Sequence, residues 1–413
     1  EVRGGDRRVG IERHSRCCMN YTAMTKRRSG LGGAKWEVYL KAKDLIAQGQ
    51  DIIEMTIGEP DVPTPEVLVD AATCAMRQGR TTYASGRGEP GLLAALAERY
   101  TRSSGREITS DQILCFPGTQ TALFTVLMGV AETGDEVLVG DPMYATYEGV
   151  IRATGADIVP GPLKPENGFR IRAQDIAERI TPKTTALLLT SPHNPTGAIL
   201  TASDIDAIGQ LAREHDLWII SDEVYEELLF NASDFTSPLS RPDLADRVIV
   251  VSSISKSHAA PGFRSGWCVG PSAFVEELLP LSETILFGNQ PFIADMTEKA
   301  LRDGSTVAEG MRQRFSLRAV LLHQRLSSET RLVVHQPKAG MFAMVNVSST
   351  GMDGNAYAMS LLEHGGVAVM PGVSFGTTID DWVRIALTVD DSQFQAACDR
   401  IIQHSKQLMR EST

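Results

Sequence analysis

The chain has 413 residues, 42% of them hydrophobic and 22% charged, and its formal net charge is −11. This length allows two or three domains, and the acidic balance argues against a nucleic-acid partner, which requires a basic surface. The chain lacks a run of about eighteen apolar residues, so we expect no membrane span.

Residues 1–18 differ in composition from the rest of the chain. They are rich in arginine and glycine and lack hydrophobic periodicity, so we expect a disordered extension or a processing remnant there. A targeting peptide is poor in acidic residues, and Glu1, Asp6 and Glu12 therefore argue against one.

The six cysteines are scattered and lack the Cys-x-x-Cys spacing of a zinc site, so we predict no metal. Several lie in apolar segments and are expected to be small buried hydrophobic residues. Together with the absence of a signal peptide, this pattern predicts a reducing, cytoplasmic location. The cysteines are Cys17, Cys18, Cys74, Cys115, Cys268 and Cys398.

Helical spacing of apolar residues first occurs at residues 36–48, ending at Gly49. Thr64 and Pro65 indicate an N-cap followed by proline at the first helical position, which predicts a helix to about residue 78. Another apolar helix is expected over residues 121–131.

Short, almost wholly apolar segments follow, separated by helical stretches such as residues 203–215. Strands of this kind between helices predict an α/β fold with a mostly parallel sheet covered on both faces. The segments are residues 136–139, 186–189, 217–220, 248–251 and 266–269. Ligands bind such sheets at the carboxyl ends of the strands, and Asn194, Asp222 and Lys256 follow three of these strands.

The last hundred or so residues predict a smaller α+β domain. Its expected elements are helices at 312–326 and near 354–363, strands around 332–334, 341–345, 367 and 383–385, and a final helix. We therefore predict an N-terminal arm and part of the small domain at 19–63, a large domain at 64–310 and the small domain at 311–413.

The segment from Ser253 to Gly266 places Lys256 directly after an apolar strand and follows it with a flexible Gly262 and Arg264. This order suits a lysine that holds an aldehyde cofactor while hydroxyl groups and a guanidinium hold a phosphate. Pyridoxal 5′-phosphate carries both groups. An ordinary strand end with a solvated lysine is the alternative.

Asp222 at a strand end could cap a following helix. With pyridoxal phosphate it would instead pair with the pyridine nitrogen and keep that nitrogen protonated, so that the ring accepts electrons from a substrate carbanion. Tyr225, three residues later, could donate a hydrogen bond to the phenolic oxygen of the ring.

Three further segments have both an ordinary and a functional interpretation. Asn194 lies in a turn-forming sequence and also offers an amide to the phenolic oxygen, whereas the neighbouring His193 is interpreted as a packing residue. Residues 118–120 open a helix, and many helices begin with such residues. Their free backbone N–H groups also suit a phosphate. Arg384 in an apolar strand could form a surface salt bridge or bind an α-carboxylate through two hydrogen bonds.

Taken together, these segments resemble the class I and II aminotransferases of pyridoxal-phosphate fold type I, and are similar to the aspartate aminotransferase family. The resemblance runs from about Trp36 to the C-terminus. It is carried by residues 57–61, Tyr83, residues 142–144, 191–197, 221–225, 253–266, 340–342 and 371–372, and Arg384.

The resemblance implies a set of cofactor-binding residues. Lys256 forms the covalent link to the aldehyde and later moves the proton between Cα and C4′. Asp222 pairs with the pyridine nitrogen, while Asn194 and Tyr225 contact the phenolic oxygen. The remaining residues are Thr119, Gln120, Ser253 and Arg264 on the phosphate, joined there by the partner subunit's Tyr83, and Tyr144 stacked on the ring.

The resemblance also implies that Arg384, Gly58 and Asn194 bind the substrate, with Arg384 and Gly58 on its α-carboxylate, and that a homodimer shares its active sites. Ser265 departs from the family pattern, which usually has an aliphatic residue there. Within the family, residues 141–148, 166–170 and 215–230 are most similar to bacterial arginine–pyruvate transaminases.

We therefore expect an enzyme that moves the α-amino group of an L-amino acid, arginine as the first choice, to a 2-oxo acid such as pyruvate by a ping-pong mechanism. A cationic donor would need an acidic group at the pocket, and Glu59 and Glu148 are candidates that could equally be solvated. Aspartate, alanine or aromatic donors, a C–S β-lyase and a non-catalytic pyridoxal-phosphate sensor are the alternatives. A dinucleotide-dependent dehydrogenase is disfavoured because no Gly-x-Gly-x-x-Gly follows a first strand.

Overall fold

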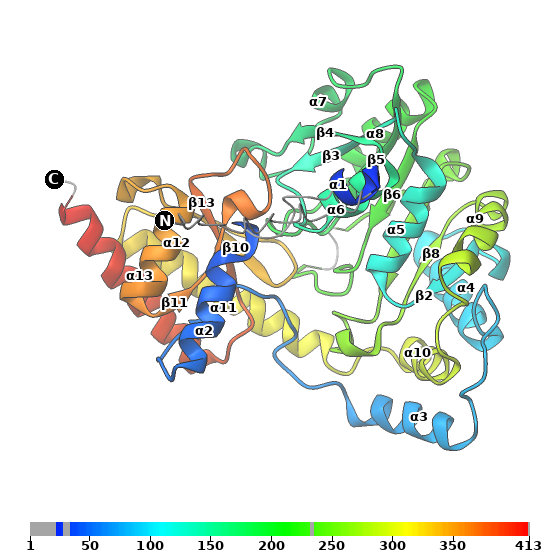
Figure 1. Ribbon diagram of the computed structural model, residues 1–413, viewed down its shortest axis with the longest axis horizontal. Helices are drawn as coiled ribbons and strands as arrows, with labels where there is room; N and C mark the ends of the chain where they lie inside the picture. Colours follow the sequence, from blue (N-terminus) through cyan, green and yellow to red (C-terminus); the bar gives the residue numbers. More distant parts are fainter. Residues whose placement is uncertain (1–21, 28–33, 232–234, 412–413) are drawn as a thin grey trace, which may run out of the picture.

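The computed structural model describes residues 22–27, 34–231 and 235–411. The extension expected at residues 1–18, with Cys17 and Cys18, lies outside the described residues. Figure 1 shows the large central sheet on one side of the molecule and the C-terminal segments, together with α2, on the other. Among the described residues, no helix is both long and apolar enough to span a lipid bilayer.

The central sheet has seven strands in the order β2-β8-β7-β6-β5-β3-β4. The neighbours from β7 to β4 pair in parallel, whereas β8 is antiparallel to both β7 and β2. The expected mostly parallel α/β sheet is therefore confirmed. Its strands are β2 Ile113–Phe116, β3 Glu136–Asp141, β4 Asp157–Pro162, β5 Thr184–Thr190, β6 Trp218–Asp222, β7 Val248–Ser253 and β8 Gly266–Val269.

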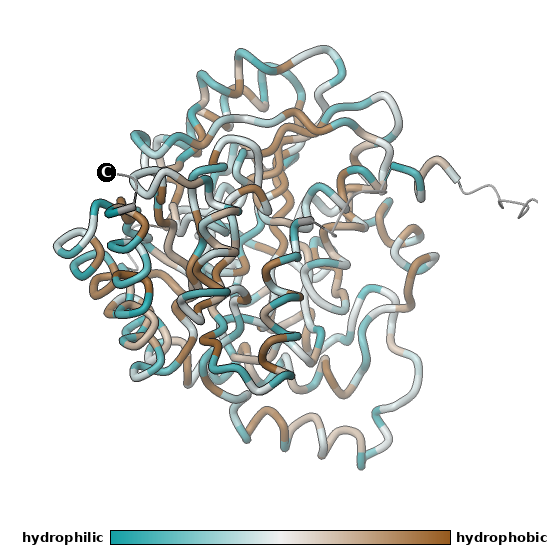
Figure 2. Tube along the Cα trace, turned by 60° about the vertical axis from the view of Figure 1, so that its left-hand side comes forward, coloured by the Kyte–Doolittle hydropathy of each residue, from teal (hydrophilic) through white to brown (hydrophobic). Residues whose placement is uncertain are grey.

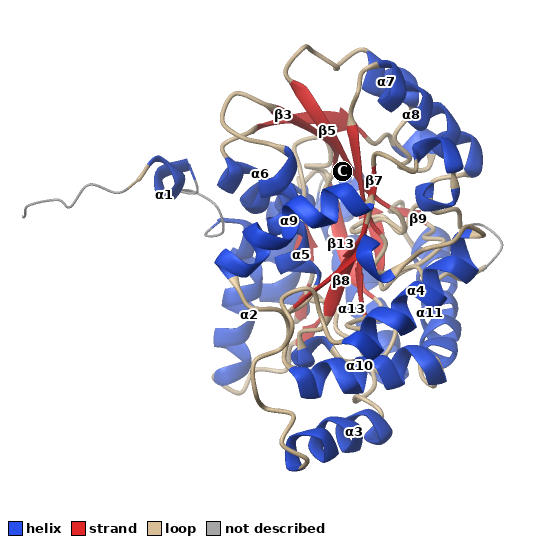
Figure 3. Cartoon of the chain, turned by 90° about the vertical axis from the view of Figure 1, so that its right-hand side faces the viewer, coloured by secondary structure: helices blue, strands red, loops and turns tan. Residues whose placement is uncertain are grey.

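Helices cover both faces of this sheet, which explains why its inner strands are apolar throughout (Figure 3). Successive residues alternate between two clusters: Leu187 packs in the cluster with α4 and α8, and Leu188 in the one with α5 and α6. One face carries α3 Glu66–Arg77, α4 Pro90–Ser104, α7 Ala173–Ala177, α8 Ala202–Glu214 and α10 Pro291–Asp303; the other carries α5 Thr119–Val130, α6 Tyr147–Thr154 and α9 Ser272–Ile285. Figure 2 shows hydrophobic and hydrophilic segments alternating along these outer helices, as expected when one face of each is buried.

The C-terminal part contains a four-stranded antiparallel sheet in the order β12-β13-β10-β9 and a two-stranded parallel pair of β1 and β11. In that pair Ile53 lies opposite Val367, so the segment after α2 joins the C-terminal part although it lies far away in sequence. The elements are α2 Glu37–Ala47, β1 Ile53–Glu54, α11 Ala308–Glu329, β9 Val333–His335, β10 Phe342–Asn346, α12 Gly354–Ser360 with a π-helical turn at Leu361–Gly365, β11 Val367–Ala368, β12 Met370–Pro371, β13 Trp382–Ala386 and α13 Asp391–Glu411. The short α1 spans Ala23–Arg27.

The structure corrects the sequence predictions at several points. Strands β2 and β4 were not expected; β4 is an edge strand that contains two prolines, which hid its character. The helix after Thr64 begins at Glu66 with Pro65 as its N-cap, and Thr64 makes no capping bond. Its hydroxyl donates instead to the carbonyl oxygen of Ala259, because a tertiary partner lies within reach.

A buried ion-pair cluster fixes the loop after β1 to α11. Asp61 accepts hydrogen bonds from Nε and Nη2 of Arg314, both at 2.7 Å, and from Nη1 of Arg318 at 3.0 Å. The side chains of Asp61 and Arg318 are only 6% and 5% exposed. Burial by itself would raise the pKa of Asp61, but the hydrogen bonds and charges of the two arginines outweigh it and hold that pKa below its usual range.

We predict that Asp61→Ala lowers the free energy of unfolding by about 3 kcal/mol at neutral pH, because it removes the buried carboxylate that pairs with Arg314 and Arg318 and leaves Arg318 paired with Asp391, which is 72% exposed. A carboxyl with a lowered folded-state pKa stabilises the fold above its unfolded pKa, so the deficit should shrink once the pH falls below about 4. Urea unfolding at pH 7 and pH 3 measures both effects.

Asp51→Ala is the matched control, because Asp51 also pairs with an arginine but its side chain is 84% exposed. That substitution should cost less than about 1 kcal/mol. Equal losses in the two variants would contradict a structural role for the Asp61 cluster.

Candidate functional site

A cavity of about 250 Å³ lies where the carboxyl ends of the central strands face the C-terminal sheet. Residues from loops far apart in sequence line it. The predicted site residues found in its wall are Gly58, Thr119, Gln120, Tyr144, Asn194, Asp222, Tyr225, Ser253, Lys256, Arg264 and Arg384.

Lys256 lies in the turn that follows β7, and its ammonium group donates to the carbonyl oxygen of Gly58 at 2.7 Å. Burial lowers the pKa of Lys256 to about 8. The carboxylate of Glu59 opposes this shift, whereas the guanidinium groups of Arg384 and Arg264 add to it. A lysine with this pKa is partly neutral at neutral pH and can act as a nucleophile or a base.

Asp222 ends β6 and is 4% exposed. Burial raises the pKa of its carboxyl to about 6, although hydrogen bonds from Tyr147 and from the backbone N–H of Val224 act in the opposite direction. The hydroxyl of Tyr147 donates to Oδ2 at 2.7 Å and also lies 2.8 Å from the hydroxyl of Thr190. An ionised Asp222 cannot donate, so Tyr147 donates to Asp222 and accepts from Thr190.

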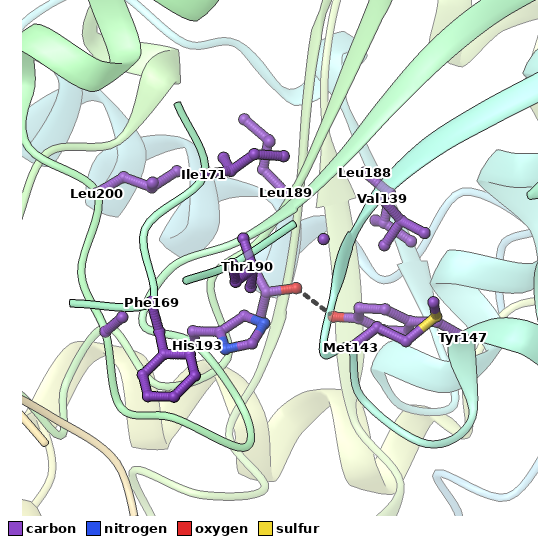
Figure 4. Close-up of a pocket in the computed structure, with 13 residues that line it drawn as sticks. Val139, Met143, Tyr147, Phe169, Ile171, Leu188, Leu189, Thr190, His193 and Leu200 are labelled. Atoms are coloured by element: carbon purple, nitrogen blue, oxygen red, sulfur yellow. Dashed lines mark hydrogen bonds between the residues drawn. The ribbon is translucent and has the colours of Figure 1, made fainter. Parts of the chain in front are cut away.

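Tyr147 is a site residue that the sequence did not reveal. It is fully buried at the start of α6, and its only local signal is a tyrosine three residues after Tyr144. Figure 4 shows its hydrogen bond to Thr190 at the wall of a second, small cavity of about 20 Å³, which shares Tyr147 and Thr190 with the main one. His193 lines the same small cavity with its Nδ1 2.8 Å from the hydroxyl of Thr196, and burial lowers its pKa to about 3, as suits a packing residue.

Arg384 lies in β13 but is 4% exposed, so the surface salt bridge considered from the sequence is wrong. Its guanidinium donates from Nη1 to Asn194 Oδ1 at 3.0 Å and from Nη2 to the carbonyl oxygen of Thr56. The guanidinium carbon lies 3.9 Å from the ring centre of Phe342 and 4.4 Å from that of Phe375. Burial lowers the pKa of Arg384 to about 10, and its buried Nε has no hydrogen-bond partner among the described residues.

An anion cradle lies where α5 begins. Gly118 precedes the helix with φ 88°, and a Cβ atom there would lie 2.3 Å from Nη2 of Arg264. The absence of that atom lets the guanidinium approach the helix N-terminus, where backbone N–H groups are unpaired. The buried hydroxyl of Thr119 has no partner among the described residues, and Ser253 closes the cavity from β7.

These groups fit pyridoxal phosphate. The lysine amine suits an aldehyde, the carboxylate of Asp222 suits a protonated pyridine nitrogen, and the cradle beside Arg264 suits a phosphate. Tyr225 and Asn194 are both buried, and a hydrogen bond joins their side chains. Their polar groups are therefore close enough together to suit one oxygen atom, the phenolic oxygen of the ring.

Two of the residues named from the sequence lie outside this cavity. Tyr83 is 92% exposed, and its ring centre is 6.2 Å from that of Phe287. Glu148 is held in ion pairs with Lys35 at 2.5 Å and Arg152 at 3.1 Å. Glu59, in contrast, lines the cavity.

Comparison with known proteins assigns the chain to a family. The family model for aminotransferase class I and II matches residues 50–401. The chain is 40% identical to the arginine–pyruvate transaminase AruH of Pseudomonas aeruginosa, over 95% of this chain and 100% of that protein. It is 32% identical to the aspartate/prephenate aminotransferase of Thermus thermophilus, over 88% of this chain and 93% of the relative.

Solved structures agree with this assignment. A single mutant of Thermus thermophilus aspartate aminotransferase superposes with a TM-score of 0.88 at 30% identity, covering 94% of this chain and all of that one. The aspartate aminotransferase of Rhizobium meliloti gives a TM-score of 0.88 at 25% identity, covering 94% of this chain and 99% of that one. The chain belongs to the class I and II aminotransferases and is a transaminase that depends on pyridoxal phosphate.

Proposed function

We propose that this transaminase takes the α-amino group of arginine and passes it to pyruvate in a ping-pong reaction. The observation that carries this choice of substrates is the 40% identity, over the whole of the relative, to a protein named for arginine and pyruvate. The relatives named for aspartate are less similar, at about 32% identity or below, and support the alternative donor more weakly.

The site residues are assigned roles within this proposal. Lys256 links to the cofactor and acts as base, Asp222 faces the pyridine nitrogen, and Tyr225 and Asn194 face the phenolic oxygen. Arg384, Gly58 and Asn194 bind the α-carboxylate side of the substrate, supported by the buried position of Arg384 beside Asn194. The phosphate is held by Thr119, Gln120, Ser253, Arg264 and the partner subunit's Tyr83, and Tyr144 stacks on the ring.

Bound pyridoxal phosphate supplies an electron sink for the pair left at Cα when the donor loses its proton. Lys256 would remove the proton from Cα and carry it to C4′ of the bound cofactor, a task that its pKa of about 8 supports because the amine must be neutral first. Arg384 fixes the donor carboxylate and so turns the Cα–H bond toward the lysine. In the second half-reaction a 2-oxo acid occupies the same position and Lys256 moves the proton in the reverse direction.

The same proposal includes a homodimer that shares its active sites. The exposed apolar segment at Ile285, Leu286 and Phe287, 40%, 42% and 61% exposed, lies beside Tyr83 and offers a surface for a second copy. We also place the enzyme in a reducing cytoplasm, a choice supported by the four cysteines among the described residues, all of which are free thiols.

The donor assignment predicts the outcome of a half-reaction screen. Purified enzyme loaded with pyridoxal phosphate should be converted to its pyridoxamine phosphate form fastest by arginine, with 2-oxoarginine released and identified by mass. Pyruvate should then restore the starting absorbance and yield alanine. Faster conversion by aspartate or an aromatic amino acid would remove the arginine assignment, and release of pyruvate and thiol from cystathionine would favour a lyase.

Lys256→Ala should fold normally and lose turnover by at least about a thousandfold, because Lys256 is the one lysine among the described residues that line the cavity. Circular dichroism and thermal unfolding check the fold, and coupled assay of alanine formation checks the rate. Added methylamine should restore part of the lost rate, since a free amine can enter the space left by the side chain. Wild-type turnover in Lys256→Ala would refute the role of the lysine.

Tyr147→Phe should raise the pKa of Asp222, because it removes a hydrogen bond that favours the charged carboxylate. The acid limb of the pH profile of kcat/KM should therefore move upward by about one pH unit, corresponding to one hydrogen bond to a charged group. Tyr357→Phe is the matched control: this buried tyrosine also bonds a hydroxyl, Ser405 at 2.8 Å, but lies outside the cavity. An unshifted profile in Tyr147→Phe would show that Tyr147 does not support the charge of Asp222.

A further inference from the structure

The segment that joins β7 to β8 carries both Lys256 and Arg264, and its backbone is strained. Four non-glycine residues in the described ranges have a positive φ angle, and two of them lie in this segment: Ala259 at 51° and Arg264 at 53°. A side chain crowds the backbone in this left-handed conformation, so residues other than glycine adopt it rarely. Interactions from elsewhere in the fold must therefore hold the segment in place.

Helix α10 and the turn after it supply such interactions. Nε2 of His258 lies 3.1 Å from the carbonyl oxygen of Ala300 and donates to it, because a carbonyl can only accept. The hydroxyl of Ser305, just beyond the helix, donates to the carbonyl oxygen of Ser257 at 2.6 Å. A third contact reaches the residue directly after Arg264, so the helix holds both halves of the segment.

That third contact joins two fully buried hydroxyl groups, those of Ser265 and Thr297, whose oxygen atoms lie 2.7 Å apart. The hydroxyl of Thr297 also lies 2.7 Å from the carbonyl oxygen of Ile293. A hydroxyl has one proton and a carbonyl can only accept, so Thr297 donates to Ile293 and Ser265 donates to Thr297. Ser265 is the position at which the sequence departs from the aliphatic residue usual in the family, and an aliphatic side chain could not form this bond.

The neighbours of Ser265 fit closely against the anion cradle. A Cβ atom at Gly266 would lie 2.6 Å from the backbone of Gly118, and one at Gly118 would lie 2.3 Å from Nη2 of Arg264. Arg264 itself is exposed, donates from Nη1 to the carbonyl oxygen of Pro261 in its own turn at 2.7 Å, and has no ion pair with a carboxylate in the described ranges. The position of its guanidinium therefore depends on the backbone that carries it, which Ser265 anchors from the next residue.

We propose that Ser265, through its hydrogen bond to Thr297 of α10, is a positioning residue that holds Arg264 against the N-terminus of α5 and so sets how tightly the enzyme binds the phosphate of its cofactor. The inference rests on the proposed role of Arg264 in holding that phosphate, and it does not depend on which amino acid is the donor. Loss of the bond leaves Arg264 chemically intact but lets its left-handed backbone relax, which moves the guanidinium away from the cradle.

The test compares pyridoxal phosphate with pyridoxal, which has the same ring and aldehyde but lacks the phosphate. Each compound is titrated into the full-length enzyme freed of its cofactor, and binding is followed by absorbance. Ser265→Ala should raise the Kd for pyridoxal phosphate by about fivefold, the scale of one hydrogen bond between neutral groups. The Kd for pyridoxal should stay unchanged, because the bond acts on the cofactor only through its phosphate.

Variants of the partner residue, and of a matched pair elsewhere, separate positioning from stability. Thr297→Val should reproduce the effect of Ser265→Ala, whereas Thr297→Ser keeps the hydroxyl and should keep the wild-type Kd. Ser405→Ala is the matched control, because its buried hydroxyl also donates to a helix carbonyl, that of Ile401 at 2.8 Å, and also pairs with a second hydroxyl, that of Tyr357. This control should leave both Kd values unchanged even where it lowers the melting temperature.

Two results with these variants would overturn the inference. An equal rise of both Kd values in Ser265→Ala would show that the bond supports the whole pocket and not the phosphate site in particular. Unchanged values in Ser265→Ala and Thr297→Val would show that it supports neither. Since the two variants remove the same bond from opposite sides, a folding failure of one leaves the other to decide.

Arg264→Ala separates a failure of the inference from a failure of the proposed site. In the Arg264→Ala background, Ser265→Ala should raise the Kd for pyridoxal phosphate no further, because the two residues act through one contact. A further fivefold rise there would show that Ser265 acts through another group. If Arg264→Ala alone left that Kd unchanged, the proposed phosphate role of Arg264 would fall, and the inference with it.

Discussion

The site depends on one buried cation, the guanidinium of Arg384. It is held between the rings of Phe342 and Phe375 and bonded to Asn194 and the carbonyl of Thr56, so it ties β13 to the loop after β5 and to the segment after β1. Burial of a charge without an acidic partner is costly, and hydrogen bonds and aromatic faces offset that cost only in part. Its Nε is buried without a hydrogen-bond partner among the described residues, which leaves capacity for the carboxylate that we propose it binds.

The same charge influences the chemistry of Lys256. Burial is the largest cause of the lowered pKa of the lysine, and the positive fields of Arg384 and Arg264 act in the same direction. Glu59 acts against them, so the pKa of about 8 is a balance between burial and the two positive charges, which lower it, and one carboxylate, which raises it. A substrate carboxylate on Arg384 and a phosphate beside Arg264 would weaken the two positive fields. The basicity of Lys256 is therefore coupled to ligand binding through groups that it does not touch.

The sequence predicted the parts of this arrangement that leave a local signal. The strands that end at Asp222 and Ser253 are apolar runs followed by polar residues, and both were placed correctly because burial on both faces permits little else. Arg384 was noticed because a charge in an apolar strand breaks the pattern. Two features outside the cavity lining were less visible: β4 was hidden by its prolines, and Thr64 bonds across the fold where its sequence suggested a helix cap.

Tyr147 shows why the rest could not be predicted. Its contact with Asp222 joins residues 75 positions apart, and nothing in the sequence around either residue encodes that meeting. The same applies to Glu59 and Glu148: the sequence does not show that Glu148 forms ion pairs with Lys35 and Arg152, or that Glu59 lines the cavity. The domain boundaries near residues 64 and 311 stay a prediction. The structure shows only that β1, which follows α2, pairs with β11 of the C-terminal part.

Two glycines show that the fold and the site are constrained together. A Cβ atom at Gly266 would lie 2.6 Å from the backbone of Gly118, and one at Gly118 would lie 2.3 Å from Arg264. The antiparallel pairing of β8 with β2 therefore brings the N-terminus of α5 against Arg264 only because both positions lack a side chain. The antiparallel strand β8 thus brings the anion cradle to the end of β7, next to the turn that contains Lys256.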